Sequence, residues 1–204
     1  MVERDAVILR ECDRWNIVLG RHLCCMASFS GQRACDRRLH KLIEAGYLKR
    51  EKIIYGVPGI YRLTPLGKSY IGIPNRKEQI RLEQVSHDIA VCDTALFFHR
   101  TYGVSFSSMQ TEKQLHQSDG FGVRCHRPDF VFMRREKLYC VEVELSLKSK
   151  ARFQKNILDN FSNYERQFWV VPDLHTRIYT FLAQMKEAYP NIVILSLSEV
   201  QKNE

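Results

Sequence analysis

The chain has 204 residues, of which 45% are hydrophobic and 26% are charged, a balance typical of a soluble globular protein. No uncharged apolar run approaches the roughly 18 to 20 residues that cross a membrane, and no basic, apolar and small-residue leader stands at the amino terminus. Seven cysteines occur without a CxxC spacing, which favours free thiols in a reduced, cytoplasmic protein. We therefore expect no membrane partner and no export.

Lysine and arginine outnumber aspartate and glutamate by 31 to 23, which gives a net charge of +8. Most of the excess lies early in the chain. Residues 1–72 hold 13 basic and 7 acidic side chains, a balance of +6, whereas residues 73–204 hold 18 and 16, a balance of +2. A basic domain of this kind attracts a polyanion, so double-stranded DNA is the partner that the charge pattern favours.

Hydrophobic periodicity predicts three helices near the amino terminus, at 3–12, 19–27 and 32–45, with Ser30 as the candidate N-cap of the third. Two strands follow at 47–54 and 60–63, separated by a loop rich in glycine and proline. The order is helix, helix, helix and hairpin.

Glycine and proline mark the ends of these elements. Gly46 ends the third helix, and Thr64 followed by Pro65 caps and begins a further helix. The phrase LHKLIEAGYLKR…YRLTPLGKSYI resembles bacterial winged-helix regulators. The resemblance implies a winged helix-turn-helix domain over residues 1–72, in which the helix from Gln32 enters the major groove of DNA. The alternative is a winged helix that contacts only proteins.

Two groups of side chains would then contact DNA. Residues of the third helix lie near base edges, and basic residues of the wing reach phosphates. The predicted DNA-binding residues are Gln32, Arg33, Arg37, Arg38, Lys41, Lys49, Arg50 and Lys52.

A domain boundary is predicted at 72–75, where Gly72 and Pro74 interrupt the pattern, and residues 76–204 form the second domain. Strands and helices alternate in this domain, which predicts an α/β core with a parallel or mixed sheet, within a chain that is α+β overall. The predicted elements are helices at 76–100, 111–117, 148–164 and 176–188 and strands at 104–107, 130–133, 138–147, 168–171 and 192–195.

The strands at 130–133 and 138–147 form a predicted hairpin in which Asp129 lies near Glu142 and Glu144. Converging carboxylates repel one another unless a cation joins them, and Mg²⁺ takes one or two carboxylates. One interpretation is therefore a Mg²⁺ site held by Asp129 and Glu142. The other is a solvated sheet face without a catalytic role.

This stretch resembles the PD-(D/E)xK nuclease superfamily through Pro128-Asp129 and Glu142. Glu144 stands where that pattern has a lysine, and Lys148 follows on the same predicted face. The resemblance implies a restriction-endonuclease-like α/β domain with a mixed sheet and Mg²⁺ as a possible cofactor. Its candidate catalytic residues are Asp129, Glu142, Glu144 and Lys148.

Along the whole chain, the phrase LTPLG, a helix bearing His87-Asp88, the phrase RPD, an acidic strand and a basic helix resemble the replication-relaxation family of bacterial plasmids and integrative elements. This resemblance implies DNA binding in plasmid replication, relaxation or regulation, as a homodimer or with other proteins of the same mobile element. Two functions stay open: a DNA-binding protein whose second domain is a scaffold, and a Mg²⁺-dependent endonuclease that cleaves phosphodiesters with Asp129 and Glu142. A third is a transcription regulator whose second domain senses a ligand, for which the sequence has no identifiable ligand motif.

Overall fold

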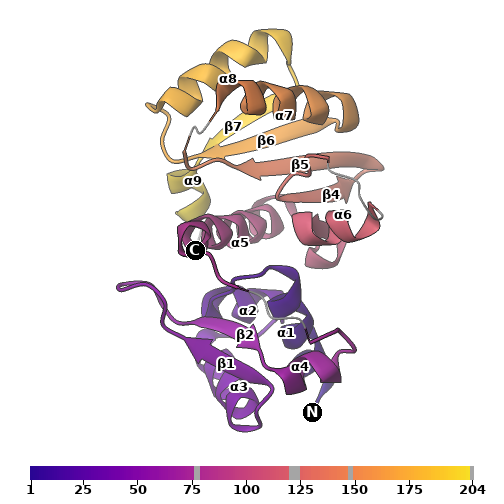
Figure 1. The fold of residues 1–204 in the computed structure, drawn as a ribbon, viewed down its shortest axis with the longest axis vertical. Coiled ribbons are helices and arrows are strands. Elements are labelled where there is room, and N and C mark those ends of the chain that lie inside the picture. The colour runs from indigo at the N-terminus through magenta and orange to yellow at the C-terminus, as the bar shows by residue number, and fades with distance from the viewer. Residues whose placement is uncertain (76–78, 120–124, 147–148, 203–204) are drawn as a thin grey trace. The chain divides into compact units, whose positions relative to one another are not determined.

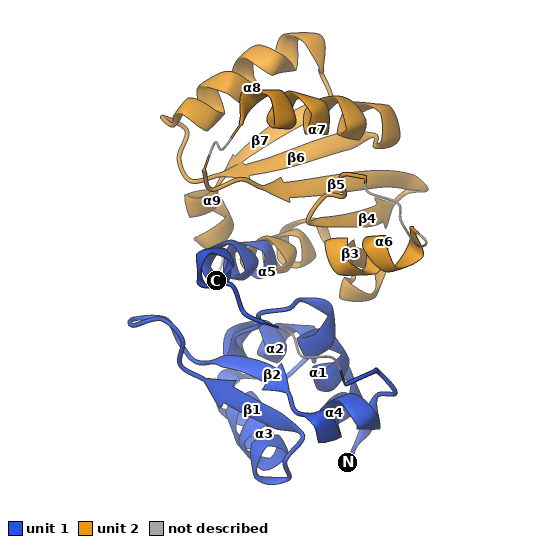
Figure 2. Cartoon of the chain, in the orientation of Figure 1, with its two compact units in different colours: residues 1–92 blue, residues 93–204 orange. Residues whose placement is uncertain are grey.

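The computed structural model describes residues 1–75, 79–119, 125–146 and 149–202. The chain divides into two compact units, Met1–Cys92 and Asp93–Glu204 (Figure 2). The division falls inside helix α5 (Leu82–Tyr102) rather than at the glycine and proline of the predicted boundary. Within the described ranges no helix is both long and apolar enough to span a membrane.

The first unit combines short helices with one two-stranded antiparallel sheet (Figure 1). Leu48 pairs with Leu63 and Glu51 pairs with Ile60, so the two strands form a hairpin in register. Its elements are α1 (Glu3–Arg14), α2 (Gly20–Met26), α3 (Gln32–Glu44), β1 (Leu48–Glu51), β2 (Ile60–Leu63) and α4 (Pro65–Tyr70).

Helix α3 ends as the sequence predicts. Gly46 has a φ of 77°, a left-handed conformation that glycine adopts without steric cost. Its N–H donates to the carbonyl of Ile43, and the N–H of Tyr47 donates to the carbonyl of Leu42. This pair of bonds satisfies the last carbonyls of the helix and turns the chain into β1.

Helix α4 lies close to the start of β1 because Gly67 has no side chain. Thr64 caps the helix by accepting a hydrogen bond of 3.1 Å from the Gly67 N–H, with Pro65 at the first helical position. A Cβ atom on Gly67 would collide with the carbonyl oxygen of Tyr47. The glycine of the LTPLG phrase is therefore required for close packing rather than for a turn.

The second unit contains a five-stranded sheet in the order β3-β4-β5-β6-β7. β3 to β5 are antiparallel, while β5, β6 and β7 are parallel, so the predicted mixed sheet is confirmed. Its elements are β3 (Met109–Thr111), α6 (Glu112–Ser118), β4 (Phe130–Arg134), β5 (Lys137–Val143), α7 (Lys150–Asn163), β6 (Arg166–Val171), α8 (Arg177–Ala188), β7 (Ile192–Ser196) and α9 (Leu197–Gln201).

Helices cover both faces of this sheet. Figure 1 shows α7 and α8 over one face, where they bury a cluster that includes Phe153, Ile157, Trp169, Ile178 and Leu182. On the other face the ring of Phe98, from the second half of α5, packs on three aromatic rings with centroids 4.9 to 6.1 Å away, those of Phe130, Phe132 and Phe168. The α/β class is confirmed.

Several predicted elements were wrong in detail, among them the strand expected at 47–54, which is Leu48–Glu51. The strand expected at 104–107 is replaced by a short 3-10 helix, Phe106–Ser108, because Ser108 bonds back to the Ser105 carbonyl through its N–H and its hydroxyl. The strand expected at 138–147 ends at Val143. The long helix begins at Leu82, later than predicted.

The N-cap of α3 is also corrected, because Gly31 rather than Ser30 takes that position. The Gly31 carbonyl accepts the first helical bonds, from the N–H groups of Ala34 and Cys35. A Cβ atom on Gly31 would meet no other atom within 4 Å.

We predict that Gly67→Ala lowers the free energy of unfolding by about 1–3 kcal/mol, since α4 must move away from Tyr47 to admit the methyl group. Denaturant unfolding of the full chain measures the change. Gly31→Ser is the matched control, because that position is open and its φ of 175° is extended. Equal stability of Gly67→Ala and the unchanged protein would contradict the packing explanation.

Candidate functional site

One candidate site is the exposed side of α3. Cys35, Leu39 and Leu42 form the buried stripe of this helix. Because side chains four residues apart lie on one side of a helix, Arg33, Arg37 and Lys41 share a side, and all three are exposed. We call these three residues the basic face.

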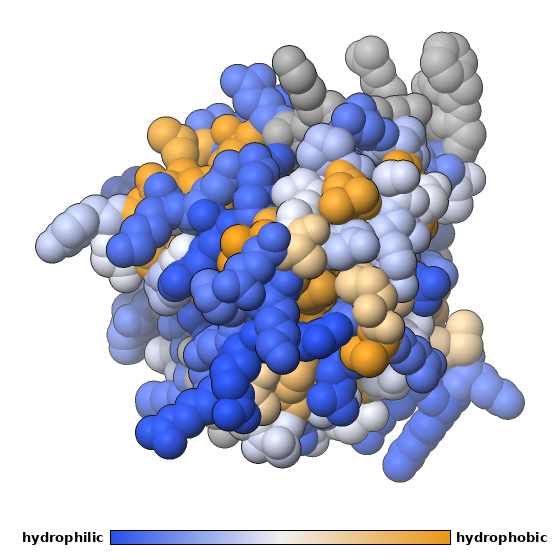
Figure 3. Space-filling view, turned by 90° about the horizontal axis from the view of Figure 1, so that it is seen from below, coloured by the Kyte–Doolittle hydropathy of each residue, from blue (hydrophilic) through white to orange (hydrophobic). Residues whose placement is uncertain are grey.

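Gln32 lies at the start of α3, in the row of Asp36 rather than in that of the basic face. Its side-chain nitrogen donates a 2.7 Å hydrogen bond to Asp36, and both residues are exposed. The bond holds the Gln32 amide along the helix, next to Arg33, where it presents a donor and an acceptor to solvent. Figure 3, which views the molecule from below Figure 1, shows a mostly hydrophilic surface with small apolar areas.

Arg38 does not belong to the basic face. Its Nε donates a 2.6 Å hydrogen bond to Asp5 of α1, and its terminal nitrogen also binds that carboxylate. Asp5 is fully buried; burial by itself raises the pKa of Asp5, but Arg38 and the Val2 N–H outweigh it and lower that pKa. Arg38 therefore joins α3 to α1, and its predicted contact with DNA stays a prediction.

The hairpin carries the remaining predicted cations. Lys49, Arg50 and Lys52 are all exposed. Lys49 Nζ lies 2.7 Å from a Glu51 carboxylate oxygen, and the Arg50 guanidinium lies 5.8 Å from the ring centroid of Tyr61. These contacts hold two of the three cations against the strands.

A second candidate site lies at one end of the hairpin formed by β4 and β5. Phe130 pairs with Val141, so the antiparallel register puts Asp129 opposite Glu142. Asp129 is half-buried, and Glu142 is only 8% exposed. The predicted proximity of these two acids follows from the register.

Two residues that the sequence analysis did not identify complete this site. His126 Nε2 lies 2.6 Å from Glu142 Oε1, and the Asn160 side-chain nitrogen donates a 2.8 Å bond to the same oxygen. Asp129 Oδ2 accepts a 2.6 Å bond from the Val143 N–H. We call His126, Asp129, Glu142 and Asn160 the carboxylate cluster.

Burial controls the protonation of this cluster. It raises the pKa of Glu142 to about 7, although His126 and Asn160 favour the charged carboxylate. Burial alone would lower the pKa of His126, but the hydrogen bond to Glu142 and the charge of Asp129 outweigh it and raise that pKa. Burial and the contact between the two groups therefore leave both Glu142 and His126 with a pKa above the ordinary value.

Of the other two predicted catalytic residues, the structure describes Glu144. Glu144 follows the end of β5, where its N–H donates to the carbonyl of Val170 and its side chain accepts a long bond of 3.4 Å from the Ser146 N–H. Lys148 lies outside the described residues.

The two predicted metal ligands offer carboxylate oxygens, which are the donors that Mg²⁺ prefers. Glu142 uses Oε1 for His126 and Asn160, and Asp129 uses Oδ2 for a backbone N–H. Across the described part of the chain, no group of three or more His, Cys, Asp and Glu side chains is arranged to hold a metal ion. The carboxylate oxygens of Asp129 and Glu142 suit Mg²⁺ by their chemistry, and the described residues add no third His, Cys, Asp or Glu ligand to them.

A signal in the sequence could have identified Asn160. Helix α7 buries Phe153, Ile157 and Asn160, which follow the helical period, whereas Leu158 and Phe161 are 49% and 41% exposed. A polar residue in the buried stripe of an amphipathic helix indicates a buried hydrogen bond. His126 had only its position beside the RPD phrase as a signal.

We predict that the carboxylate cluster stabilises the fold more at pH 5 than at pH 8. Glu142 and His126 both have a raised pKa, so the folded chain holds protons that the unfolded chain releases, for Glu142 between its ordinary 4.5 and about 7. The stability difference between the unchanged protein and Glu142→Gln should fall by about 1–3 kcal/mol across this range.

Urea unfolding at several pH values tests this prediction. Glu136→Gln, which alters an exposed acid in the turn between β4 and β5, is the control and should leave the pH profile unchanged. A difference that is flat or rises with pH would show that the pair does not retain extra protons in the folded state.

No protein-family model matches the sequence, and no curated protein matches it. Among solved structures, the chain is similar to the crystal structure of protein VC1899 from Vibrio cholerae, with 9% sequence identity and a TM-score of 0.39. The similarity covers 97% of this chain and 47% of that one, so the chain spans about half the length of that structure. A similarity at this level assigns neither a fold family nor a function.

Proposed function

We propose that the chain binds double-stranded DNA through its first unit, which acts as a winged helix. In this proposal α3 is the recognition helix and the hairpin of β1 and β2 is the wing. The observation that carries the proposal is the basic face, three exposed cations spaced four residues apart on one side of α3. The +6 balance of residues 1–72 supports it.

The geometry of α3 suits the major groove. A groove of roughly 12 Å admits one helix, and residues on the exposed side reach the base edges. Gln32 and Arg33 lie in the first turn of α3 and Arg37 in the second, so these residues are the proposed base contacts. Lys49, Arg50 and Lys52 of the hairpin then neutralise phosphates.

The second unit, in this proposal, is a restriction-endonuclease-like scaffold for dimerisation or for contact with other proteins of a mobile element. Its mixed sheet, covered by helices on both faces, is compatible with such a domain. A cytoplasmic role in plasmid replication, relaxation or regulation is proposed from the resemblance to the replication-relaxation family.

We predict that Arg33→Ala and Arg37→Ala each weaken DNA binding by about 1–3 kcal/mol if the arginine makes a bidentate base contact. Fluorescence anisotropy with duplex DNA selected by the unchanged protein measures the affinity. Arg177→Ala, which removes an exposed arginine at the start of α8, is the control and should bind normally.

Salt titration separates base contacts from phosphate contacts. Lys49→Ala and Lys52→Ala should lower the salt dependence of binding by about one unit of slope for each lost phosphate contact. Unchanged affinity in both arginine variants would exclude α3 as the recognition helix.

A second candidate function is a Mg²⁺-dependent DNA endonuclease, favoured by the register that puts Asp129 opposite Glu142. These two carboxylates would hold the ion, which when bound supplies a Lewis acid for phosphodiester hydrolysis. Glu144 and Lys148 are the further candidates for positioning the attacking water. Asn160 and His126 orient Glu142 by binding its Oε1 atom.

Under this second candidate, Asp129→Asn and Glu142→Gln abolish metal-dependent cleavage of supercoiled plasmid while DNA affinity stays unchanged. Gel analysis with Mg²⁺ or Mn²⁺ detects nicked and linear products. Arg33→Ala is the complementary variant: its affinity for DNA should fall, and its cleavage should fall only as a consequence. Retarded but uncut plasmid in the presence of either metal would reject the endonuclease and leave the DNA-binding proposal intact.

A further inference from the structure

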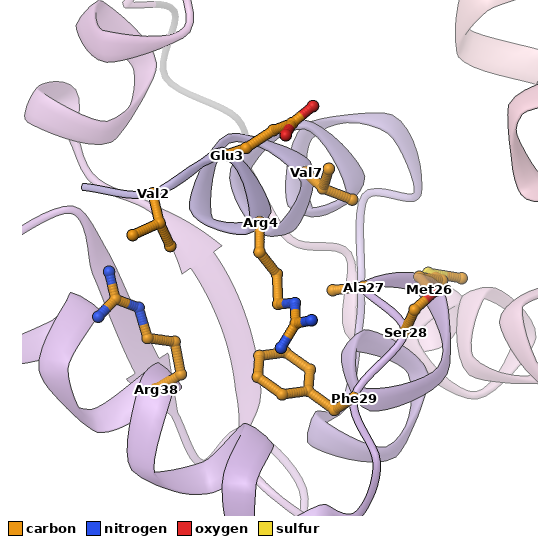
Figure 4. Close-up of a pocket in the computed structure, with 9 residues that line it drawn as sticks. All are labelled: Val2, Glu3, Arg4, Val7, Met26, Ala27, Ser28, Phe29 and Arg38. Carbon is orange, nitrogen blue, oxygen red and sulfur yellow. The ribbon is translucent and has the colours of Figure 1, made fainter.

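The first unit contains a cavity of about 550 Å³ between α1 and the turn that connects α2 to α3 (Figure 4). Its volume lies within the range of small-molecule sites, roughly 300 to 1,000 Å³. The residues that matter for its chemistry are Arg4, Val7, Met26, Ala27, Ser28 and Phe29. None of them belongs to the basic face or to the carboxylate cluster.

Arg4 provides the charge of this cavity. Its guanidinium lies 4.7 Å from the ring centroid of Phe29, and no carboxylate within the described part of the chain contacts it. Figure 4 shows that the neighbouring Glu3 carboxylate points away from Arg4. A guanidinium stacked on an aromatic ring keeps its N–H groups directed outward in the ring plane, so it can bind a planar anion in a bidentate manner.

A second arginine at the cavity does not add to this charge. Arg38 lines the far side, but the carboxylate of Asp5 binds it from within the core. The two charges cancel. Glu3 also lines the cavity, but its carboxylate points away from Arg4 (Figure 4), so Arg4 is the cation that can meet a single negative charge.

The remaining wall is apolar and adaptable. Val7, Met26 and Ala27 line the cavity, and the Met26 thioether makes favourable contacts with flat or irregular apolar groups. Ser28 contributes an exposed hydroxyl beside the turn. A ligand that contacts both Arg4 and the apolar residues needs one planar anionic group and a compact apolar body.

We infer that this cavity binds a small monocarboxylate with a compact apolar body, whose carboxylate pairs with Arg4. The apolar body lies against Val7, Met26 and Ala27. Such a site is separate from DNA binding, because it requires neither the basic face nor a nucleic acid. It is nevertheless formed in part by the turn that leads into α3, so a bound acid contacts the segment that precedes the basic face.

Benzoate is the probe that tests the inference, with benzamide as its neutral isostere. Titration of the protein with either compound, followed by NMR of the methyl groups of Val7, Met26 and Ala27, measures binding at the cavity. Benzoate should give saturable shifts of these methyl signals, and benzamide should bind at least tenfold more weakly because it lacks the charge that Arg4 pairs with.

Two variants locate the carboxylate. Arg4→Gln should weaken benzoate binding at least tenfold, whereas Arg10→Gln, which changes an exposed arginine of α1 outside the cavity, should leave it unchanged. Phe29→Leu should weaken binding to an intermediate degree because the guanidinium loses its support. Equal binding of benzoate and benzamide, equal binding by Arg4→Gln, or no saturable shift would overturn the inference.

Discussion

Each unit buries a carboxylate, and its fold depends on the hydrogen bonds and positive charge that stabilise that carboxylate. An ionised acid in a protein interior costs several kcal/mol unless hydrogen bonds and a positive charge compensate it. Asp5 satisfies this need through Arg38, and so fixes α3 against α1. Glu142 satisfies it through His126 and Asn160, and so joins the loop before β4, the strand β5 and the helix α7.

This constraint also determines which polar groups are left for function. Arg38 is committed to the core, while Arg33 and Arg37, on the same helix, are exposed. The consecutive residues Arg37 and Arg38 thus lie on different sides of α3, the first exposed and the second bound to Asp5. In the second unit one carboxylate oxygen of Glu142 is committed to two neighbours, so whatever chemistry this site performs must use the other side of that group.

The sequence analysis predicted most helices and strands well, but it missed the side-chain hydrogen bonds between residues far apart in the chain. The helices at 3–12, 32–45 and 176–188 and the strand at 60–63 are present nearly as predicted, because apolar spacing and capping residues define them locally. The contact of Arg38 with Asp5 spans 33 positions, and that of Asn160 with Glu142 spans 18. No local pattern encodes such pairs. The register of β4 and β5 was predictable because the turn between them is only two residues long.

The close approach of α4 to β1 has a consequence for reading other sequences. Gly67 is defined by what lies opposite it, the backbone of Tyr47, and not by a conformation that only glycine adopts. A backbone oxygen cannot be exchanged for a smaller group by any substitution elsewhere in the chain. The glycine of LTPLG therefore sets how closely the helix can approach the strand. A chain with a larger residue at this position must hold its helix farther from the strand.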